Sequence, residues 1–274
     1  MRNEGVIAVA WILLTAALYA QTMPPNLDEK KINPKDDLTY VWIPPATFQM
    51  GCLGAVIPRP TGPGVEECLG NELPRHFVRL SKGYWIGQTL VPQYAYRRVI
   101  GANPSNFQGD QLPIDSVSWE DAKIYCERVG MRLPTEAEWE HAARGGLSTE
   151  RYGQINELAW YRGNSGGRTH PVAEKKPNPY GLYDVLGNVW EWVADWYGAY
   201  PRARNGACCE DPGEPTLDPK GPATGRYHVI RGGSWNDFSA EVRIALRDHP
   251  KSTPAEDSVR DYDEYSTGFR CVEN

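Results

Sequence analysis

The sequence predicts an α+β fold, formed as a single domain with little regular secondary structure and long structured loops. Ten Trp and fifteen Tyr stand against five Phe, and the 274 residues include 27 Gly and 23 Pro. Gly and Pro are typical of turns, whereas Trp and Tyr can hold loops because their N–H and O–H groups find partners when buried. Two helical patterns and several short strand-like segments complete the prediction, without internal repeats.

Short strands are expected on both sides of the helices. Each is a run rich in β-branched or aromatic residues that ends near a turn, which is the usual signature of a strand. The expected strands are 40–43, 47–51, 76–80, 84–87 and 228–231.

Two helices are expected in the middle of the chain. Ser118 is a good N-cap for a helix over 119–129, because its hydroxyl can accept a bond from a free amide of the first turn. Thr135, with Glu138 three residues later, forms a capping box for a helix over 136–143.

The N-terminal region has the pattern of an export signal. Residues 6–19 form an almost unbroken apolar run after Arg2, and a small-residue cleavage site follows it. The run is shorter than the roughly 20 residues that a membrane span needs, although an uncleaved anchor is the alternative. We predict a signal peptide over 1–20, a polar linker over 21–37 and the folded domain over 38–274. The mature protein is expected to be secreted or periplasmic, without a membrane span.

The net charge disfavours one class of partner. Thirty-five acidic against 29 basic residues leave a formal net charge of −6. Binding to phosphate groups needs a basic face, and no cluster of Lys or Arg in the sequence supplies one. Nucleic acid is therefore not expected as a partner.

The six cysteines fit an exported protein, in which an even count favours disulfides. They are Cys52, Cys68, Cys126, Cys208, Cys209 and Cys271. Six cysteines allow 15 pairings, although Cys52 and Cys68 bracket a loop rich in Gly and Pro that a cross-link would close. Cys208 and Cys209 are adjacent, so they could form a vicinal disulfide, pair elsewhere or hold a soft metal such as Cu(I).

Short blocks of Gly, Trp and polar residues occur in a fixed order toward the C-terminus. They are Gly187-Asn188-Val189-Trp190-Glu191-Trp192, Arg231-Gly232-Gly233-Ser234-Trp235 and Gly268-Phe269-Arg270. Together with residues 131–140, 178–184, 50–51 and 74–76, they resemble the formylglycine-generating enzyme, or sulfatase-modifying factor, family. The resemblance runs from about residue 40 to the C-terminus and implies a variant of the C-type-lectin-like fold.

The resemblance does not decide the function, because the family contains enzymes, catalytically silent members and ligand-binding members. Its copper oxidases are expected to hold the metal with two cysteines after the Gly-Gly-Ser block. Residues 235–247 contain no Cys, and Asp and Ser oxygens do not replace thiolates for Cu(I). The five His residues are scattered, so neither copper nor iron is expected. Trp190 and Ser234 match residues beside the family's pocket and, with Trp235, are the pocket candidates, although all three also suit a structural role.

The resemblance also implies a calcium site. Carried over residue by residue, the side chains of Asp184 and Glu191 and the backbone carbonyls of Gly187 and Val189 would bind the ion. Hard oxygen ligands grouped on a tight turn are what Ca²⁺ prefers. The alternative is a turn with two solvated carboxylates.

The resemblance further implies a Cys126–Cys271 disulfide that ties the C-terminus to the first helix. Four residues after Trp235 are candidates for the rim of a ligand groove. They are Asn236, Asp237, Arg243 and Arg247. The arginines either recognise an anionic ligand or brace the core against acidic partners such as Asp184, Asp195 or Asp248, and the second interpretation is favoured.

These observations predict an exported, calcium-stabilised domain without the copper–cysteine oxidase site. It would bind a peptide, a protein or a small polar ligand, or serve as a scaffold. The alternative is a metal-dependent oxidoreductase of the sulfatase-modifying type that uses O₂, with Cys208 and Cys209 as its thiol pair.

Overall fold

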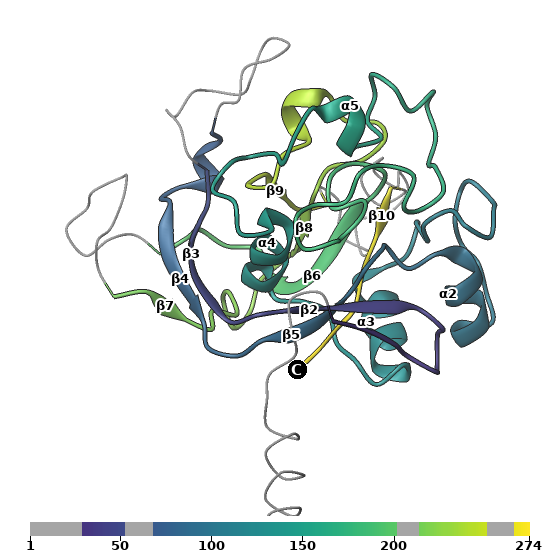
Figure 1. Ribbon diagram of the computed structural model, residues 1–274, viewed down its shortest axis with the longest axis horizontal. Helices are drawn as coiled ribbons and strands as arrows, with labels where there is room; N and C mark the ends of the chain where they lie inside the picture. Colours follow the sequence, from purple (N-terminus) through teal and green to yellow (C-terminus); the bar gives the residue numbers. More distant parts are fainter. Residues whose placement is uncertain (1–28, 53–67, 202–213, 251–265) are drawn as a thin grey trace, which may run out of the picture.

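The computed structural model describes residues 29–52, 68–201, 214–250 and 266–274 (Figure 1). The expected signal peptide, the first part of the expected linker, and Cys208 and Cys209 lie outside these ranges. No helix in the described part of the chain is long and apolar enough to cross a membrane.

The first sheet joins the two ends of the described chain. Its strands are, in order, β1 (Lys30–Ile32), β2 (Thr39–Ile43), β5 (Tyr84–Gly87) and β11 (Val272–Glu273). All neighbours are antiparallel. Figure 1 shows β2 and β5 side by side along the lower edge of the domain.

The segment expected to be a linker, 21–37, is part of this sheet from Lys30 onward. β1 pairs with β2, and the side chain of Asp36 is fully buried. Its carboxylate accepts hydrogen bonds from the hydroxyl groups of Tyr40 (2.8 Å) and Tyr125 (3.4 Å). The polar composition indicated a linker, but these polar groups find partners inside the domain.

Two further sheets form the centre and one flank. The central sheet has the order β10 (Thr267–Gly268), β6 (Trp190–Trp196), β8 (His228–Arg231) and β9 (Arg247–Asp248), and the flanking sheet has the order β3 (Ala46–Met50), β4 (His76–Leu80) and β7 (Thr216–Leu217). All five expected strands are present, with ends within one residue of the prediction. The α+β fold with little regular secondary structure is confirmed.

The helices are short. They are α2 (Gln93–Ile100), α3 (Trp119–Arg128), α4 (Glu136–Arg144) and α5 (Ile155–Leu158), with 3-10 turns η1 (Gly70–Glu72) and η2 (Ser239–Glu241). Of these, α4 lies between the flanking sheet and the central sheet. The two expected helices begin as predicted: the Ser118 hydroxyl accepts from the Asp121 amide (3.1 Å), and the Thr135 hydroxyl accepts from the Glu138 amide (3.2 Å). α2 was not expected, because it begins after Pro92 without a capping side chain.

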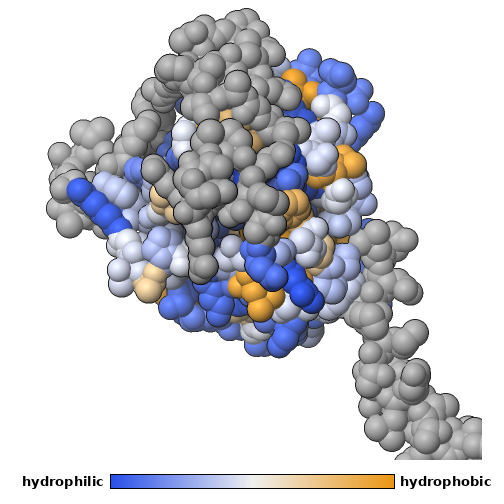
Figure 2. Space-filling model, turned by 90° about the vertical axis from the view of Figure 1, so that its left-hand side faces the viewer, coloured by the Kyte–Doolittle hydropathy of each residue, from blue (hydrophilic) through white to orange (hydrophobic). Residues whose placement is uncertain are grey.

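Helix α4 lies at the centre of the domain, against β3, β4 and β6 (Figure 1). Trp139 and Ala142 pack on these strands in one hydrophobic core, and α3 contributes Cys126 to a second core with Phe269. The face toward β4 and β7 is mostly hydrophilic among the described residues, with hydrophobic residues in small separate patches (Figure 2). Burial of the two cores supplies the main driving force for this fold.

Five charged side chains form what we call the α4 ion network. They are Glu136, Glu140 and Arg144 on α4, Arg231 on β8 and Arg247 on β9, and each is at most 4% exposed. Arg231 donates to Glu140 (2.5 Å) and to Glu136 (3.1 Å), while both oxygens of Glu136 accept from Arg247 at 2.7 Å. Arg144 donates twice to one oxygen of Glu140, at 2.9 and 2.6 Å. The network therefore ties α4 to two strands of the central sheet.

The pKa of Glu140 shows the balance within this network. Burial by itself would raise that pKa, but the guanidinium groups of Arg144 and Arg231 outweigh burial and hold the pKa below its ordinary value of 4.5. Glu140 is thus an ionised group in the interior, and it depends on both arginines to remain so.

Asp195, at the end of β6, lies beside the network without an ion pair among the described residues. It is 4% exposed and accepts a hydrogen bond from the backbone amide of Glu136 (2.8 Å). Burial, and next the Glu136 carboxyl group, raise the pKa of Asp195 from 3.8 to about 7. The interior therefore disfavours the charged form of this side chain.

Replacing Arg231 with Met should destabilise the protein strongly. The substitution leaves Glu140 with one cation and Glu136 with one, both in the interior, and breaking a buried pair in this way costs about 3–5 kcal/mol. We expect urea denaturation to show a loss of that size in the free energy of unfolding. The matched control is Arg97→Met, which breaks an exposed pair with Asp110 and should cost about 0–1 kcal/mol. Similar losses for both variants would contradict a structural role for the network.

Replacing Asp195 with Asn should remove part of the pH dependence of stability. Because folding raises the pKa of Asp195, its stabilising contribution is complete below about pH 4 and is lost as the pH rises through about 7. The amide is uncharged and keeps an acceptor for the Glu136 amide. We expect Asp195→Asn to raise the free energy of unfolding by on the order of 2 kcal/mol at about pH 8 and to leave it unchanged near pH 4. An equal effect at the two pH values would contradict this assignment.

Candidate functional site

The candidate site is built on a tight turn that precedes β6. Gly187 and Asn188 adopt left-handed backbone angles, with φ of +72° and +61°. A Cβ atom at Gly187 would lie 2.3 Å from the carbonyl oxygen of Trp160, so only Gly allows the two segments to approach this closely. The turn therefore brings the segment around Trp160 against the start of β6.

Asn188 connects three loops from inside this turn. Its fully buried side chain accepts from the amide of His170 (3.1 Å) and donates to the carbonyl of the same residue (3.0 Å). Its backbone donates to the carbonyl of Trp160 and accepts from the amide of Trp235. Asn188 was not among the residues expected to be functional, although it lies inside one of the motifs.

The two acidic side chains expected to bind calcium lie at this turn and are buried. Glu191 is 1% exposed and accepts two hydrogen bonds from Arg270, at 2.7 and 2.8 Å. Asp184 is 2% exposed and accepts from the amide of Ala173 (2.7 Å). Burial raises the pKa of Asp184 from 3.8 to about 6, although the Ala173 amide and Arg270 oppose this increase. The alternative of two solvated carboxylates is therefore wrong.

The chemistry of this turn fits a calcium ion. Asp184 is buried without an ion pair within 4 Å among the described residues, and an unpaired buried carboxylate is costly unless a cation compensates it. Glu191 already pairs with Arg270, but each carboxylate oxygen keeps a further lone pair. With the carbonyl groups of Gly187 and Val189, the set consists of hard oxygen donors. When bound, the ion would join the strands and loops that meet at this turn.

Two of the three pocket candidates are interior residues. Trp190 is 3% exposed and packs in the core around α3. Ser234 is 1% exposed, and its hydroxyl and backbone amide both donate to the Asp237 carboxylate at 2.7 Å. These contacts give both residues a structural role and leave them almost no surface for a ligand.

Trp235 is the pocket candidate that reaches the surface. Its ring packs edge to face against Phe107, with 5.6 Å between ring centres, and its carbonyl accepts from the Ser165 hydroxyl (2.8 Å). Arg168 lies over the ring of Phe107, and Arg162 lies 4.5 Å over the ring of Phe238, which is 59% exposed.

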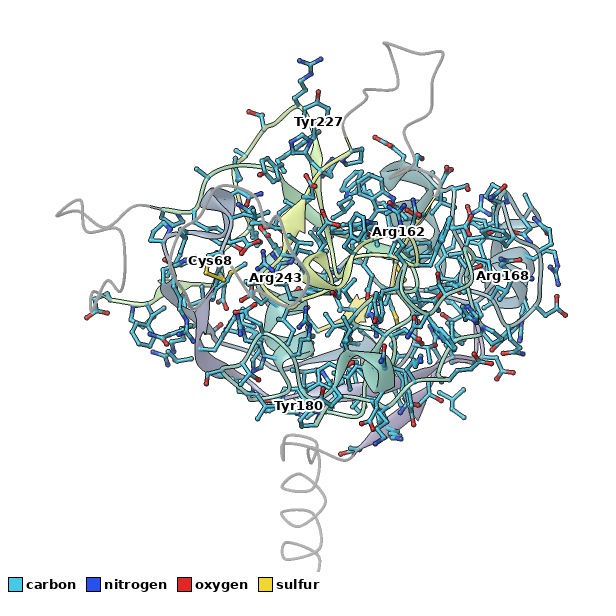
Figure 3. The ribbon with its side chains drawn as sticks, turned by 90° about the horizontal axis from the view of Figure 1, so that it is seen from above. Cys68, Arg162, Arg168, Tyr180, Tyr227 and Arg243 are labelled. Atoms are coloured by element: carbon cyan, nitrogen blue, oxygen red, sulfur yellow. A yellow bond between two sulfur atoms is a disulfide. The ribbon has the colours of Figure 1, made fainter. Side chains whose placement is uncertain are left out.

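We call these five residues the Trp235 surface: Phe107, Arg162, Arg168, Trp235 and Phe238. Figure 3 labels its two arginines. The Arg162 amide donates to the carbonyl of Asp237 (3.0 Å), so two of the three loops that carry this surface are joined. Asn236 and Asp237, the two rim candidates next to Trp235, are half-buried. Sequence reasoning missed Phe107, Arg162 and Arg168, because they come from distant loops without a motif.

Arg243 and Arg247 do not lie on a rim. Arg243 is 1% exposed and makes two 2.5 Å hydrogen bonds to Glu72. Arg247 is 2% exposed and belongs to the α4 ion network. The bracing role favoured by the sequence analysis is the one that the contacts support. The partners are glutamates, however, and not the aspartates that were expected.

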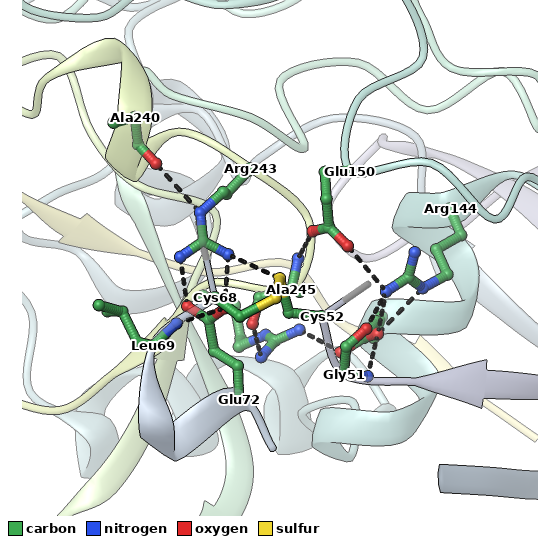
Figure 4. The surroundings of a disulfide bond; sticks show 12 residues. Gly51, Cys52, Cys68, Leu69, Glu72, Arg144, Glu150, Ala240, Arg243 and Ala245 are labelled. Carbon is green, nitrogen blue, oxygen red and sulfur yellow. Dashed lines mark hydrogen bonds and ion pairs between the residues drawn. A yellow bond between two sulfur atoms is a disulfide. The ribbon is translucent and has the colours of Figure 1, made fainter. Parts of the chain in front are cut away.

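Two disulfides lie in the described part of the chain, Cys52–Cys68 and Cys126–Cys271. Figure 4 shows the first beside Arg243, whose guanidinium group is 3.8 Å from the sulfur of Cys52. The segment that would supply a copper-binding thiol pair instead carries Asp237, which is bound to Ser234. The residues at this position do not fit a copper ion held by two cysteines.

Comparison with known proteins gives consistent results. Residues 27–274 match the sulfatase-modifying factor enzyme 1-like domain. The formylglycine-generating enzyme of Streptomyces coelicolor is 37% identical over 197 residues, which cover 65% of this chain and 57% of the enzyme. The serine/threonine-protein kinase pkn1 of Chlamydia pneumoniae is 36% identical over 209 residues, which cover 76% of this chain but 30% of the kinase.

Among solved structures, Treponema denticola variable protein 1 is similar over nearly its whole length. The comparison covers 90% of this chain and 99% of that protein, with a TM-score of 0.70 and 27% sequence identity. The chain thus spans less than two thirds of the two curated relatives, whereas it matches this structure almost end to end.

Proposed function

The chain belongs to the sulfatase-modifying factor family, and from this premise we propose that it is a calcium-stabilised binding module of an exported protein. Its ligand is a peptide or a small polar molecule, and it binds at the Trp235 surface. The observation that carries the proposal is this surface itself. The exposed ring of Phe238 and the half-buried rings of Phe107 and Trp235 lie near two exposed guanidinium groups, and the Asn188 turn ties together two of the three loops that carry them.

The composition of the Trp235 surface suits recognition of planar and anionic groups. Aromatic rings offer large contact areas with little conformational entropy to lose, and Arg is the side chain best suited to pair with carboxylates. Arg162 and Arg168 are both exposed and lie over rings, so their guanidinium groups are directed before a ligand arrives. Ordering of side chains before binding reduces the entropic cost of association.

A second candidate function is oxidation of cysteine in a peptide. Its support is the 37% identity to an enzyme named for formylglycine generation. Against it, residues 235–247 contain no Cys, and the four described cysteines are paired in disulfides. Only Cys208 and Cys209 would remain as thiols for Cu(I), so this function would require a metal position different from that of the family.

Elemental analysis of the exported protein, purified without a metal-binding tag, should find about one calcium per chain. Asp184→Asn should lose the ion, because the amide removes one of two anionic ligands. Chelation should lower the melting temperature of the parent but not of Asp184→Asn, since bound calcium adds about 2.7 kcal/mol when it is present at 100 times its Kd. Asp218→Asn, in an exposed loop, is the control. Stoichiometric copper would instead favour the oxidase.

A displayed library of peptides should yield ligands that depend on the Trp235 surface. We expect Trp235→Ala and Arg162→Gln each to raise the Kd of a selected peptide at least about tenfold, as for residues central to an interface. Leu217→Ala, which changes an apolar residue that is 61% exposed elsewhere, should leave the Kd unchanged. Selected peptides that bind both surface variants as tightly as the parent would count against this surface.

A further inference from the structure

Two adjoining cavities lie apart from the residues of the Trp235 surface. The larger, about 590 Å³, opens between α3, the start of α4 and the turn before β5. The smaller, about 350 Å³, lies beside β4 and the end of β6. Asp195, Pro219 and Lys220 line both. We call this pair of cavities the Asp195 cleft.

Asp195 is covered from one side by the chain that follows β7. Gly221 has a φ of +67°, and a Cβ atom there would lie 3.0 Å from both Cβ and Oδ1 of Asp195. Only Gly lets the backbone pass so close to this carboxylate. Its other oxygen accepts from the amide of Glu136, in the first turn of α4, where the helix dipole favours an anion.

The other acidic groups in the larger cavity already have partners. Asp218 accepts from Ser81, Glu138 pairs with Arg132, and Glu127 lies 3.7 Å from Lys123. In the smaller cavity, Glu136 pairs with Arg247. Asp195 and Asp218 are thus the acids of the cleft without a cation within 4 Å among the residues that the structure describes. Asp218 is exposed to solvent, whereas Asp195 is buried.

A matching cation stands at the mouth of the cleft. Lys220 is exposed and lines both cavities, but it makes no ion pair within 4 Å in the described part of the chain. Lys82, also exposed, lines the larger cavity and acts on Asp218 at longer range. The cleft therefore presents a negative group in its wall and positive groups at its edge.

The lining of the cleft also includes aromatic rings. The imidazole ring of His228 is stacked between Trp119 and Trp196, with both ring centres 3.7 Å away. Trp119 lines the larger cavity and Trp196 the smaller. Such rings can pack against the short aliphatic chain of a ligand. The polar ends of that ligand would then have to bind Asp195 and Lys220.

We propose that the Asp195 cleft binds a small zwitterion, with its ammonium group on the Asp195 carboxylate and its carboxylate on the ammonium group of Lys220. The ammonium group supplies the cation that the buried carboxylate lacks, and hydrogen bonds between charged groups are the strong ones. The pKa of Asp195, raised by burial, agrees with a site that gains from an added positive charge. This site is separate from the peptide surface and does not depend on the function proposed for it.

The test uses the mature full-length protein and ligands that differ by one charged group. The probes are 6-aminohexanoate, hexylamine and hexanoate, with glycine and 4-aminobutyrate to measure the spacing between the charges. Calorimetry near pH 8, supported by the intrinsic tryptophan fluorescence of the protein, gives the Kd of each. We expect at least one of the ω-amino acids to bind at least about tenfold more tightly than both hexylamine and hexanoate.

Two variants identify the two ends of the ligand. Asp195→Asn should make the Kd of the zwitterion equal to that of hexanoate. Lys220→Gln should make the Kd of the zwitterion equal to that of hexylamine. Lys30→Gln, an exposed lysine on β1, is the matched control and should change neither. Denaturation curves for each variant establish that it is folded.

Either of two results overturns the proposal. One is the absence of saturable binding for every ω-amino acid up to about 10 mM. The other is binding that Asp195→Asn and Lys220→Gln, both folded, leave unchanged. Neither result would bear on the Trp235 surface, because the peptide selection uses different residues.

Discussion

The rest of the structure depends on the ion network that holds α4. Two glutamates one helical turn apart, Glu136 and Glu140, place their charges in the interior, where they are tolerable only with cations at hydrogen-bond distance. Two of the three cations, Arg231 and Arg247, come from β8 and β9. The helix therefore cannot be displaced from the central sheet without leaving a buried charge with fewer partners. Because Arg231 directly precedes the loop that carries Trp235, the same contacts also fix the position of this part of the Trp235 surface.

The strand β6 links the two sites that we propose. It follows the turn of Asn188, whose carbonyl accepts from the Trp235 amide, and its last residues include Asp195, in the wall of the cleft. The buried carboxylates at the two ends of the strand are compensated by different partners. At the start, Glu191 is paired with Arg270, whereas Asp195 has one amide and no described cation. A domain with little regular structure can in this way place two chemically different sites near the two ends of one strand.

Much of the fold could be predicted because its signals are local. Ser118 and Thr135 mark the starts of α3 and α4, since a capping side chain acts on amides two or three residues away. The strands are recognisable from short runs of β-branched and aromatic residues. Prediction failed for β1 and α2, where local composition was polar or a cap was missing, and where tertiary contacts such as those of Asp36 decide the outcome. For the site, the motifs located the Asn188 turn but not Phe107 and Arg168 of the Trp235 surface.

The sequence by itself determined the family, the cysteines available for cross-links, and the lack of a thiol pair after the Gly-Gly-Ser block, because these are properties of residue identity and order. The tertiary structure alone decided which charged groups are interior and which reach solvent. Arg243 and Arg247 look like Arg162 and Arg168 in a sequence, yet the first pair is buried on glutamates and the second lies exposed over aromatic rings. The physical reason is that burial and charge pairing depend on contacts between distant segments, which no local pattern encodes.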